Sequence, residues 1–194
     1  MSNDSDDFDP NEYAIRAIHD WVWSGFYAEA EVEEKSGYLV REEDCDEATV
    51  KAAIKTEFSR KCREELLWPA ETDCDRLDRA FVALATQRII AVQNAGYTLD
   101  EGFADVAEAL ASADRSRFFG YCLYHGQDVE RAVNGQGLML AFGVVSEDDS
   151  RKAEVGNKVR DVLQSFGFEV RWDGDAERRI EIPHIDWKRR LTTR

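Results

Sequence analysis

The chain has 194 residues, of which 43% are hydrophobic and 11% aromatic, and its formal net charge is −15. This length and apolar content predict a globular protein with one substantial core and exclude wholesale disorder. The acidic balance argues against nucleic-acid binding, which normally requires a basic surface.

The first half of the chain is predicted to be helical. Helices are expected from Asn11, over 46–67 and over 73–87, because apolar residues recur there at helical spacing. The segment 31–47 breaks this periodicity with Gly37 and acidic runs, so no helix is expected there. The apolar stripe of the second helix consists of Val50, Ile54, Phe58, Cys62 and Leu66.

Strands and helices alternate in the second half. The expected strands cover 89–92, 118–124 and 138–145, and the expected helices cover 98–111, 128–133 and 152–166. The second and third strands are apolar on both faces, which predicts central positions in a sheet. Two alternating segments, 168–172 and 178–182, flank an Asp-Gly-Asp turn and predict a β-hairpin.

This order of elements predicts an α+β fold. A disordered acidic tail at 1–10 precedes a single domain at 11–194. Within the domain, a helical lobe at about 11–87 is followed by a sheet lobe at about 88–194, with a mixed β-sheet, flanking helices and the C-terminal hairpin. If the central strands are parallel neighbours, the polar turn that follows the first of them lies at the carboxyl edge of the sheet.

The sequence predicts neither a membrane span nor a cofactor. The apolar runs are shorter than the roughly 20 residues that cross a bilayer, and the acidic N-terminus is unlike a signal peptide. We therefore expect a cytoplasmic protein. Cys45, Cys62, Cys74 and Cys122 lack metal-ligand or redox spacing, so we expect free and mostly buried thiols.

Three segments of the chain resemble an uncharacterised bacterial domain family, a domain of unknown function. The segments are NAGYT at 94–98, GYCLYHGQDVERA at 120–132 and GLMLAFG at 137–143. The resemblance extends over most of residues 13–190. It implies a bacterial cytosolic origin and carries no assigned activity.

Polar residues follow the strand at 118–124 and form the main catalytic candidate. His125, Asp128 and Glu130 bring an imidazole and two carboxylates together, which suits acid–base chemistry or a hard metal ion. The structural alternative is that Asp128 caps the short helix and His125 forms a local hydrogen bond. Only one histidine lies here, which argues against a metal site, and no Gly-x-Ser-x-Gly elbow is present.

Further residues are candidates for lining a pocket at the same edge of the sheet. Glycines near this edge can let an anion approach the backbone, and side chains from the neighbouring turn can line the pocket. The alternative role for these residues is turn geometry. They are Asn94, Tyr97, Gln127, Gly135 and Gly137.

Two hypotheses of function follow from these patterns. In the first, the protein is a protein-binding module, of inhibitor or immunity type, that holds a basic partner protein. Residues 1–47 support it, because they carry fifteen acidic and three basic side chains. The aromatic cluster Trp21, Trp23, Phe26 and Tyr27 is either core or interface. In the second, the protein is a small hydrolase with His125 as base and Asp128 or Glu130 orienting it or holding a metal.

Overall fold

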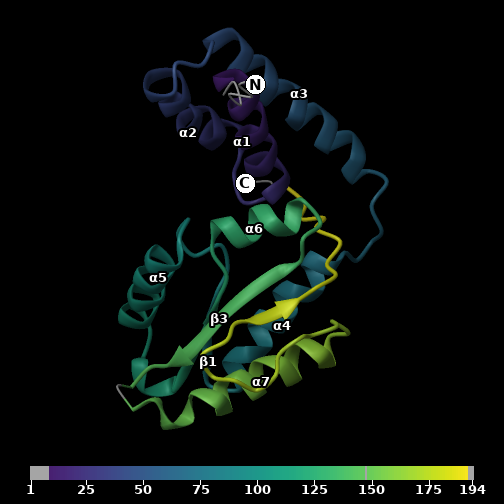
Figure 1. Cartoon of the computed structure of the whole chain (residues 1–194). Coiled ribbons are helices and arrows are strands. Elements are labelled where there is room, and N and C mark those ends of the chain that lie inside the picture. The colour runs from purple at the N-terminus through teal and green to yellow at the C-terminus, as the bar shows by residue number, and fades with distance from the viewer. Residues whose placement is uncertain (1–8, 147, 192–194) are drawn as a thin grey trace, which may run out of the picture. The chain divides into compact units, whose positions relative to one another are not determined.

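The computed structural model describes residues 9–146 and 148–191 (Figure 1). They form two compact units. The helical unit contains the described residues up to Pro69 and those from Lys188 onward, and the sheet unit is Ala70–Trp187. The third predicted helix, 73–87, thus belongs with the strands and not with the helical lobe in which we expected it.

The helical unit contains three α-helices, α1 (Pro10–Ser24), α2 (Glu29–Glu42) and α3 (Glu47–Glu65). Asp9 caps α1 by accepting a hydrogen bond from the Asn11 amide at 2.8 Å, and Asp46 caps α3 by accepting one from the Thr49 amide at 2.7 Å. Of the predicted tail, 1–8 lie outside the described residues, whereas its last two residues begin α1. The buried core comprises Ala14, Ile18, Trp21, Val22, Val32, Leu39, Cys45, Val50, Ile54 and Phe58.

The helix α2 corrects the prediction that 31–47 is irregular. Val32, Ser36 and Leu39 are buried on one side of it, at helical spacing. Its first turn is fixed by Glu31, whose carboxylate accepts a hydrogen bond from the Ala28 amide at 2.7 Å. Gly37 lies inside the helix, where glycine is less favourable for helix stability than alanine by about 1 kcal/mol. The helix-forming residues around it offset that loss.

The apolar stripe of α3 is shorter than predicted. Val50, Ile54 and Phe58 are buried, but Cys62 is exposed and Leu66 is 84% exposed. The buried position in that turn is instead Lys61, whose ammonium group donates a hydrogen bond to the Val22 carbonyl at 2.9 Å. The thiols of Cys45, Cys74 and Cys122 are buried, as expected.

The sheet unit is a mixed four-stranded sheet with helices on its faces. The strands are β1 (Ile89–Val92), β2 (Gly120–Leu123), β3 (Leu138–Val144) and β4 (Ile180–Ile182), in that spatial order. The α-helices are α4 (Asp73–Thr86), α5 (Leu99–Ser112), α6 (Gly126–Val133) and α7 (Lys152–Ser165), and 3-10 turns cover Arg115–Arg117 and Asp149–Arg151. Helix α5 packs on one face of the sheet, and α4 packs with α7 on the other (Figure 1). The α+β prediction and the central positions of β2 and β3 are confirmed.

The pairing of the central strands differs from the parallel arrangement that we considered. Strands β1 and β2 are parallel, but β2 and β3 are antiparallel, with Cys122 opposite Phe142. The chain reverses after α6 at Gly135 and Gly137, whose φ angles of 71° and 75° are in the left-handed region. As a result β3 starts at the end of the sheet where β2 finishes.

The predicted C-terminal hairpin is reduced to one antiparallel bridge. Arg171 and Glu181 exchange both backbone hydrogen bonds, at 2.9 and 3.0 Å. The next residue, Trp172, turns its indole N–H toward the loop carbonyls of Asp175 and Arg178, at 2.9 and 3.2 Å. On its opposite edge, strand β4 pairs with β3 in antiparallel orientation.

Candidate functional site

The turn between β2 and α6 holds the two central catalytic candidates inside the sheet unit. His125 and Asp128 are 5% and 1% exposed. The Asp128 carboxylate accepts a hydrogen bond from the His125 backbone amide at 3.1 Å, and the same oxygen lies 3.2 Å from His125 Nε2. Asp128 therefore closes the first turn of α6 in the way that the structural alternative predicts.

Arg179, just before β4, completes this buried polar cluster. Its guanidinium donates to the Asp128 carboxylate and, at 3.0 Å, to the Met139 carbonyl. One carboxylate oxygen thus faces a guanidinium, an imidazole and a backbone amide. This Asp128 cluster, formed by His125, Asp128 and Arg179, ties α6 to β3 and to the residue before β4.

The environment of His125 disfavours its charged form. Burial lowers its pKa, and the Arg179 charge adds to that effect, while the Asp128 charge and the Tyr97 carbonyl oppose it. Nδ1 is buried and has no partner of hydrogen-bond geometry among the described residues. A base in general catalysis must reach its substrate, and the faces of this imidazole are covered by the protein.

Glu130 points away from the other two candidates. Residues two apart on a helix do not share a face, and Asp128 is buried while Glu130 reaches the surface of α6. There its carboxylate accepts a hydrogen bond from the Tyr97 hydroxyl at 3.2 Å. The three predicted catalytic side chains therefore form two separate groups.

Some of the predicted pocket-lining residues do lie together. The Gly126 amide donates to the Gly96 carbonyl at 2.9 Å, and the Gln127 amide donates to the Tyr97 carbonyl at 3.2 Å. These bonds join the turns that follow the parallel strands β1 and β2, next to Asn94, which has a φ of 49°. At the other end of α6, Gly135 is exposed and Gly137 is packed against the chain after β4.

The four aromatic candidates are largely covered by the helical unit itself. Trp21 is buried, and the Lys35 ammonium lies 4.9 Å from its ring centroid and 5.5 Å from that of Tyr27. The Arg189 guanidinium lies 4.4 Å from the Phe26 ring. Trp23 donates from its indole N–H to a Glu57 carboxylate oxygen at 2.6 Å.

Glu57 is the centre of a polar cluster that no sequence pattern predicts. The carboxylate oxygen that accepts from Trp23 lies 3.1 Å from His19 Nδ1 and 3.0 Å from an Arg60 nitrogen. Glu57 is only 8% exposed. The contacts of Trp23 and His19 with this carboxylate join α1 to α3, and we assign the cluster a structural role.

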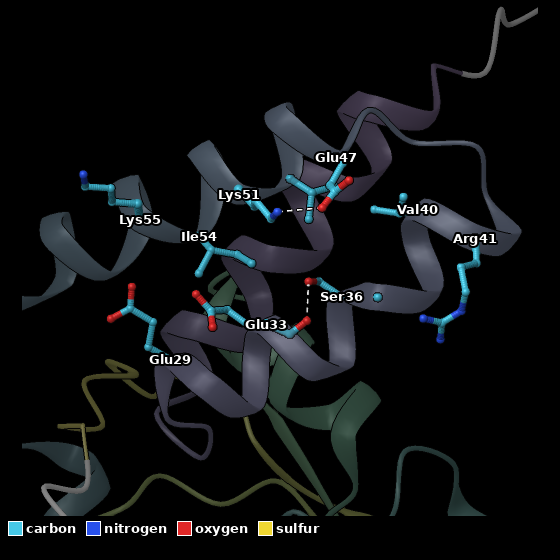
Figure 2. A pocket seen from close by; sticks show the side chains of 11 residues that line it. Glu29, Glu33, Ser36, Val40, Arg41, Glu47, Lys51, Ile54 and Lys55 are labelled. Carbon is cyan, nitrogen blue, oxygen red and sulfur yellow. Dashed lines mark hydrogen bonds and ion pairs between the residues drawn. The ribbon is translucent and has the colours of Figure 1, made fainter.

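A hollow with an apolar floor lies between α2 and α3, and Figure 2 shows the side chains around it. This α2–α3 groove has a volume of about 590 Å³, which is in the range of ligand sites. Val40, Val50 and Ile54 line its floor. The remaining lining residues are Glu29, Glu33, Ser36, Gly37, Arg41, Glu47, Lys51 and Lys55.

The two walls of the α2–α3 groove differ in charge. Glu29 and Glu33 lie on the α2 wall, and Lys51 and Lys55 lie on the α3 wall (Figure 2). Among residues 9–146 and 148–191, no ion pair within 4.0 Å engages either glutamate or Lys55, whereas Lys51 pairs with Glu47 at 2.6 Å. The segment 29–46 carries eight acidic and two basic residues, whereas α3 carries four acidic and five basic residues.

The sequence did contain a signal for this groove. Both charge pairs are four residues apart, so each occupies one face of its helix. The spacing of Glu29 and Glu33 indicates a groove wall only if these residues lie on a helix. Because the sequence pattern predicts an irregular segment at 31–47, it does not reveal this wall.

The described part of the chain contains neither a metal-binding group of side chains nor a membrane-spanning helix. In residues 9–146 and 148–191, no three His, Cys, Asp or Glu side chains are grouped so that they could hold a metal ion. In the same ranges, no helix combines the length and the apolarity that crossing a bilayer requires.

Comparison with protein families gives one match that spans nearly the whole chain. The model of DUF6891, described as a domain of unknown function, matches residues 7–191. The chain belongs to the DUF6891 family. Comparisons with curated proteins and with solved structures found no match. For this DUF6891 domain, the geometry of its own side chains is therefore the guide to function.

Proposed function

We propose that this DUF6891 protein is a protein-binding module, of inhibitor or immunity type, that holds a basic segment of a partner protein in the α2–α3 groove. The observation that carries the proposal is the α2 wall, where Glu29 and Glu33 lie beside an apolar floor and have no ion-pair partner among residues 9–146 and 148–191. Carboxylates in that position attract a basic segment, and the floor then buries its apolar side chains.

The groove is equipped for binding rather than for bond cleavage. Its one hydroxyl, that of Ser36, is engaged as a donor to the Glu33 carbonyl at 2.8 Å, and no histidine or cysteine lines it. The hydrolase hypothesis receives less support, because His125 is buried and Asp128 is already bound to Arg179. We therefore place the function in the helical unit.

A titration with a designed probe tests this proposal. The probe is a fluorescent amphipathic helical peptide of about 18 residues, long enough to be helical, with leucines on one face and lysines on the rest. The full-length protein should bind it, more weakly at high salt, and a version with glutamates in place of the lysines should not bind.

A matched pair of charge reversals locates the site. Glu29→Lys with Glu33→Lys should weaken binding about tenfold, since two attractions become repulsions of about 0.5 kcal/mol or more each. Glu34→Lys with Glu42→Lys changes the net charge of the same helix equally, but these residues do not line the groove. Equal weakening by both variants would contradict a binding site in the groove.

A further inference from the structure

We infer that the partner contacts the α2–α3 groove through an amphipathic helix with a basic flank toward α2 and an acidic flank toward α3. This inference rests on the proposed function and adds what the partner's contact element must look like. It starts from two pairs of like charges that face each other across the groove, Glu29 and Glu33 on α2 and Lys51 and Lys55 on α3. The lining also includes Arg41 of α2 and Glu47 of α3, which is paired with Lys51.

The spacing of the charges matches a helix. Each wall repeats its charge after four residues, which is about one turn or 6 Å along a helix. A ligand helix repeats its own side chains at the same pitch on each side. An extended strand has only two faces, so it cannot present an apolar ridge and two different charged flanks at once.

The lysines on the α3 wall are available to a ligand. Lys51 and Glu47 form an ion pair whose side chains are 71% and 64% exposed, and such exposed pairs contribute little. The hydrogen bond to Glu47, together with the charges of Glu47 and Glu33, raises the pKa of Lys51, so its ammonium stays charged. Lys51 can exchange Glu47 for a ligand carboxylate at small cost, and Lys55 has no ion pair among the described residues to give up.

Gly37 lets a ligand helix approach the α2 backbone. It lines the groove from inside α2 and has no side chain there. An added Cβ would meet the Arg41 guanidinium, with Nη1 at 3.0 Å, a flexible group that can move. Glycine is the least favourable residue apart from proline inside a helix, and access to the groove explains its place here.

Three helical peptides of about 18 residues test the inference, all with the same leucine face. The segregated peptide carries lysines on one flank and glutamates on the other. The mixed peptide has the same composition with both charges on both flanks, and the third peptide is basic on both flanks. Affinities are measured by fluorescence anisotropy with the full-length protein, and bound-peptide helicity by circular dichroism.

The segregated peptide should bind about tenfold more tightly than the mixed peptide and more tightly than the basic one, because only it has complementary charges on both walls. In the Lys51→Glu, Lys55→Glu variant the order should reverse in favour of the basic peptide. Gly37→Leu should weaken every peptide by filling the groove, while circular dichroism shows an intact fold.

The outcomes separate this inference from the proposed function. If the segregated and mixed peptides bind equally, or if the basic peptide binds wild type most tightly, the inference is overturned and the proposed function stands. If Glu29→Lys with Glu33→Lys affects no peptide, both are overturned. Sedimentation equilibrium tests whether a second copy of the chain occupies the groove. If wild type is a dimer and Glu29→Lys with Glu33→Lys is a monomer, a second copy occupies the groove and the inference is likewise wrong.

Discussion

Charged side chains serve different purposes in the two units. In the sheet unit, Asp128 is 1% exposed, and its carboxylate contacts the His125 amide and the Arg179 guanidinium, which also binds the Met139 carbonyl. On the α2–α3 groove of the helical unit, Glu29 and Glu33 are exposed and have no ion-pair partner within the described ranges. Buried charges that pair within the protein maintain a structure, whereas exposed charges beside an apolar floor are available to a partner.

The largest expected effect is on the Asp128 cluster. Asp128→Ala removes the carboxylate that faces Arg179 and the His125 amide. Removing one partner of a buried ion pair should lower the free energy of unfolding by about 3 kcal/mol, the low end of the usual range, since Arg179 keeps some contact with solvent. Urea unfolding of the full-length protein measures this change.

Glu130→Ala is the matched control for that comparison. Its side chain lies on the same helix, at the surface, and contacts the Tyr97 hydroxyl. Its removal should lower the free energy of unfolding by less than about 1 kcal/mol. If Asp128→Ala costs no more than Glu130→Ala, the structural assignment of the Asp128 cluster is wrong.

A smaller effect is expected from the protonation of His125. Burial lowers its pKa in the folded protein, whereas in the unfolded chain histidine has a pKa of about 6.5. The unfolded state therefore binds more protons below that pH, and the free energy of unfolding must fall as the pH is lowered through it. Above about pH 6.5 both states are neutral and the effect vanishes.

Urea midpoints at about pH 7.5 and about pH 5.5, on either side of the histidine pKa, measure this effect. Wild type should lose more stability between the two than His125→Gln, which cannot take up the proton. His184→Gln is the control, because His184 is exposed, and it should behave like wild type. An identical loss in wild type and His125→Gln would show that the buried imidazole does not govern this pH dependence.

The smallest effect on stability is expected at the groove. Glu29→Ala with Glu33→Ala should change the free energy of unfolding by less than about 0.5 kcal/mol, as is usual for surface substitutions, while binding of the basic peptide weakens. A loss of stability comparable to that of Asp128→Ala would mean that these glutamates support the fold and would remove the contrast between the two units.

Most of the sheet unit could be predicted from the sequence, because its elements have local signals. The strand at Ile89–Val92 has the predicted limits, and Thr98 caps α5 by accepting from the Glu101 amide at 3.4 Å. The direction of β3 was not predictable in this way, since it depends on where the chain re-enters the sheet. Nor was the Arg179 contact, which joins residues 51 positions apart.

The helical unit shows why the candidate site escaped prediction. Gly37 disfavours a helix, and the many charged residues around it leave few apolar positions to show the helical period, so the sequence pattern does not predict α2 or the groove. Rules that predict secondary structure from local sequence fail at functional sites, where a residue can serve ligand access at a cost in stability. We interpret Gly37 as such a residue, because it leaves room for a ligand beside the α2 backbone. The prediction that Cys62 is buried is also wrong. Helical spacing shows which residues of α3 share a face, but it does not show how far along the helix other elements cover that face.

The most direct test of the account is to map peptide binding by NMR. The lysine-flanked amphipathic peptide is titrated into uniformly ¹⁵N-labelled full-length protein, and amide shifts are followed. We predict that the shifts concentrate on the groove residues of α2 and α3, among them Glu33, Gly37 and Lys51, and leave the amides of His125 and Gly126 unchanged. Shifts centred on the turn at 125–128, with α2 and α3 unaffected, would contradict the placement of function in the helical unit.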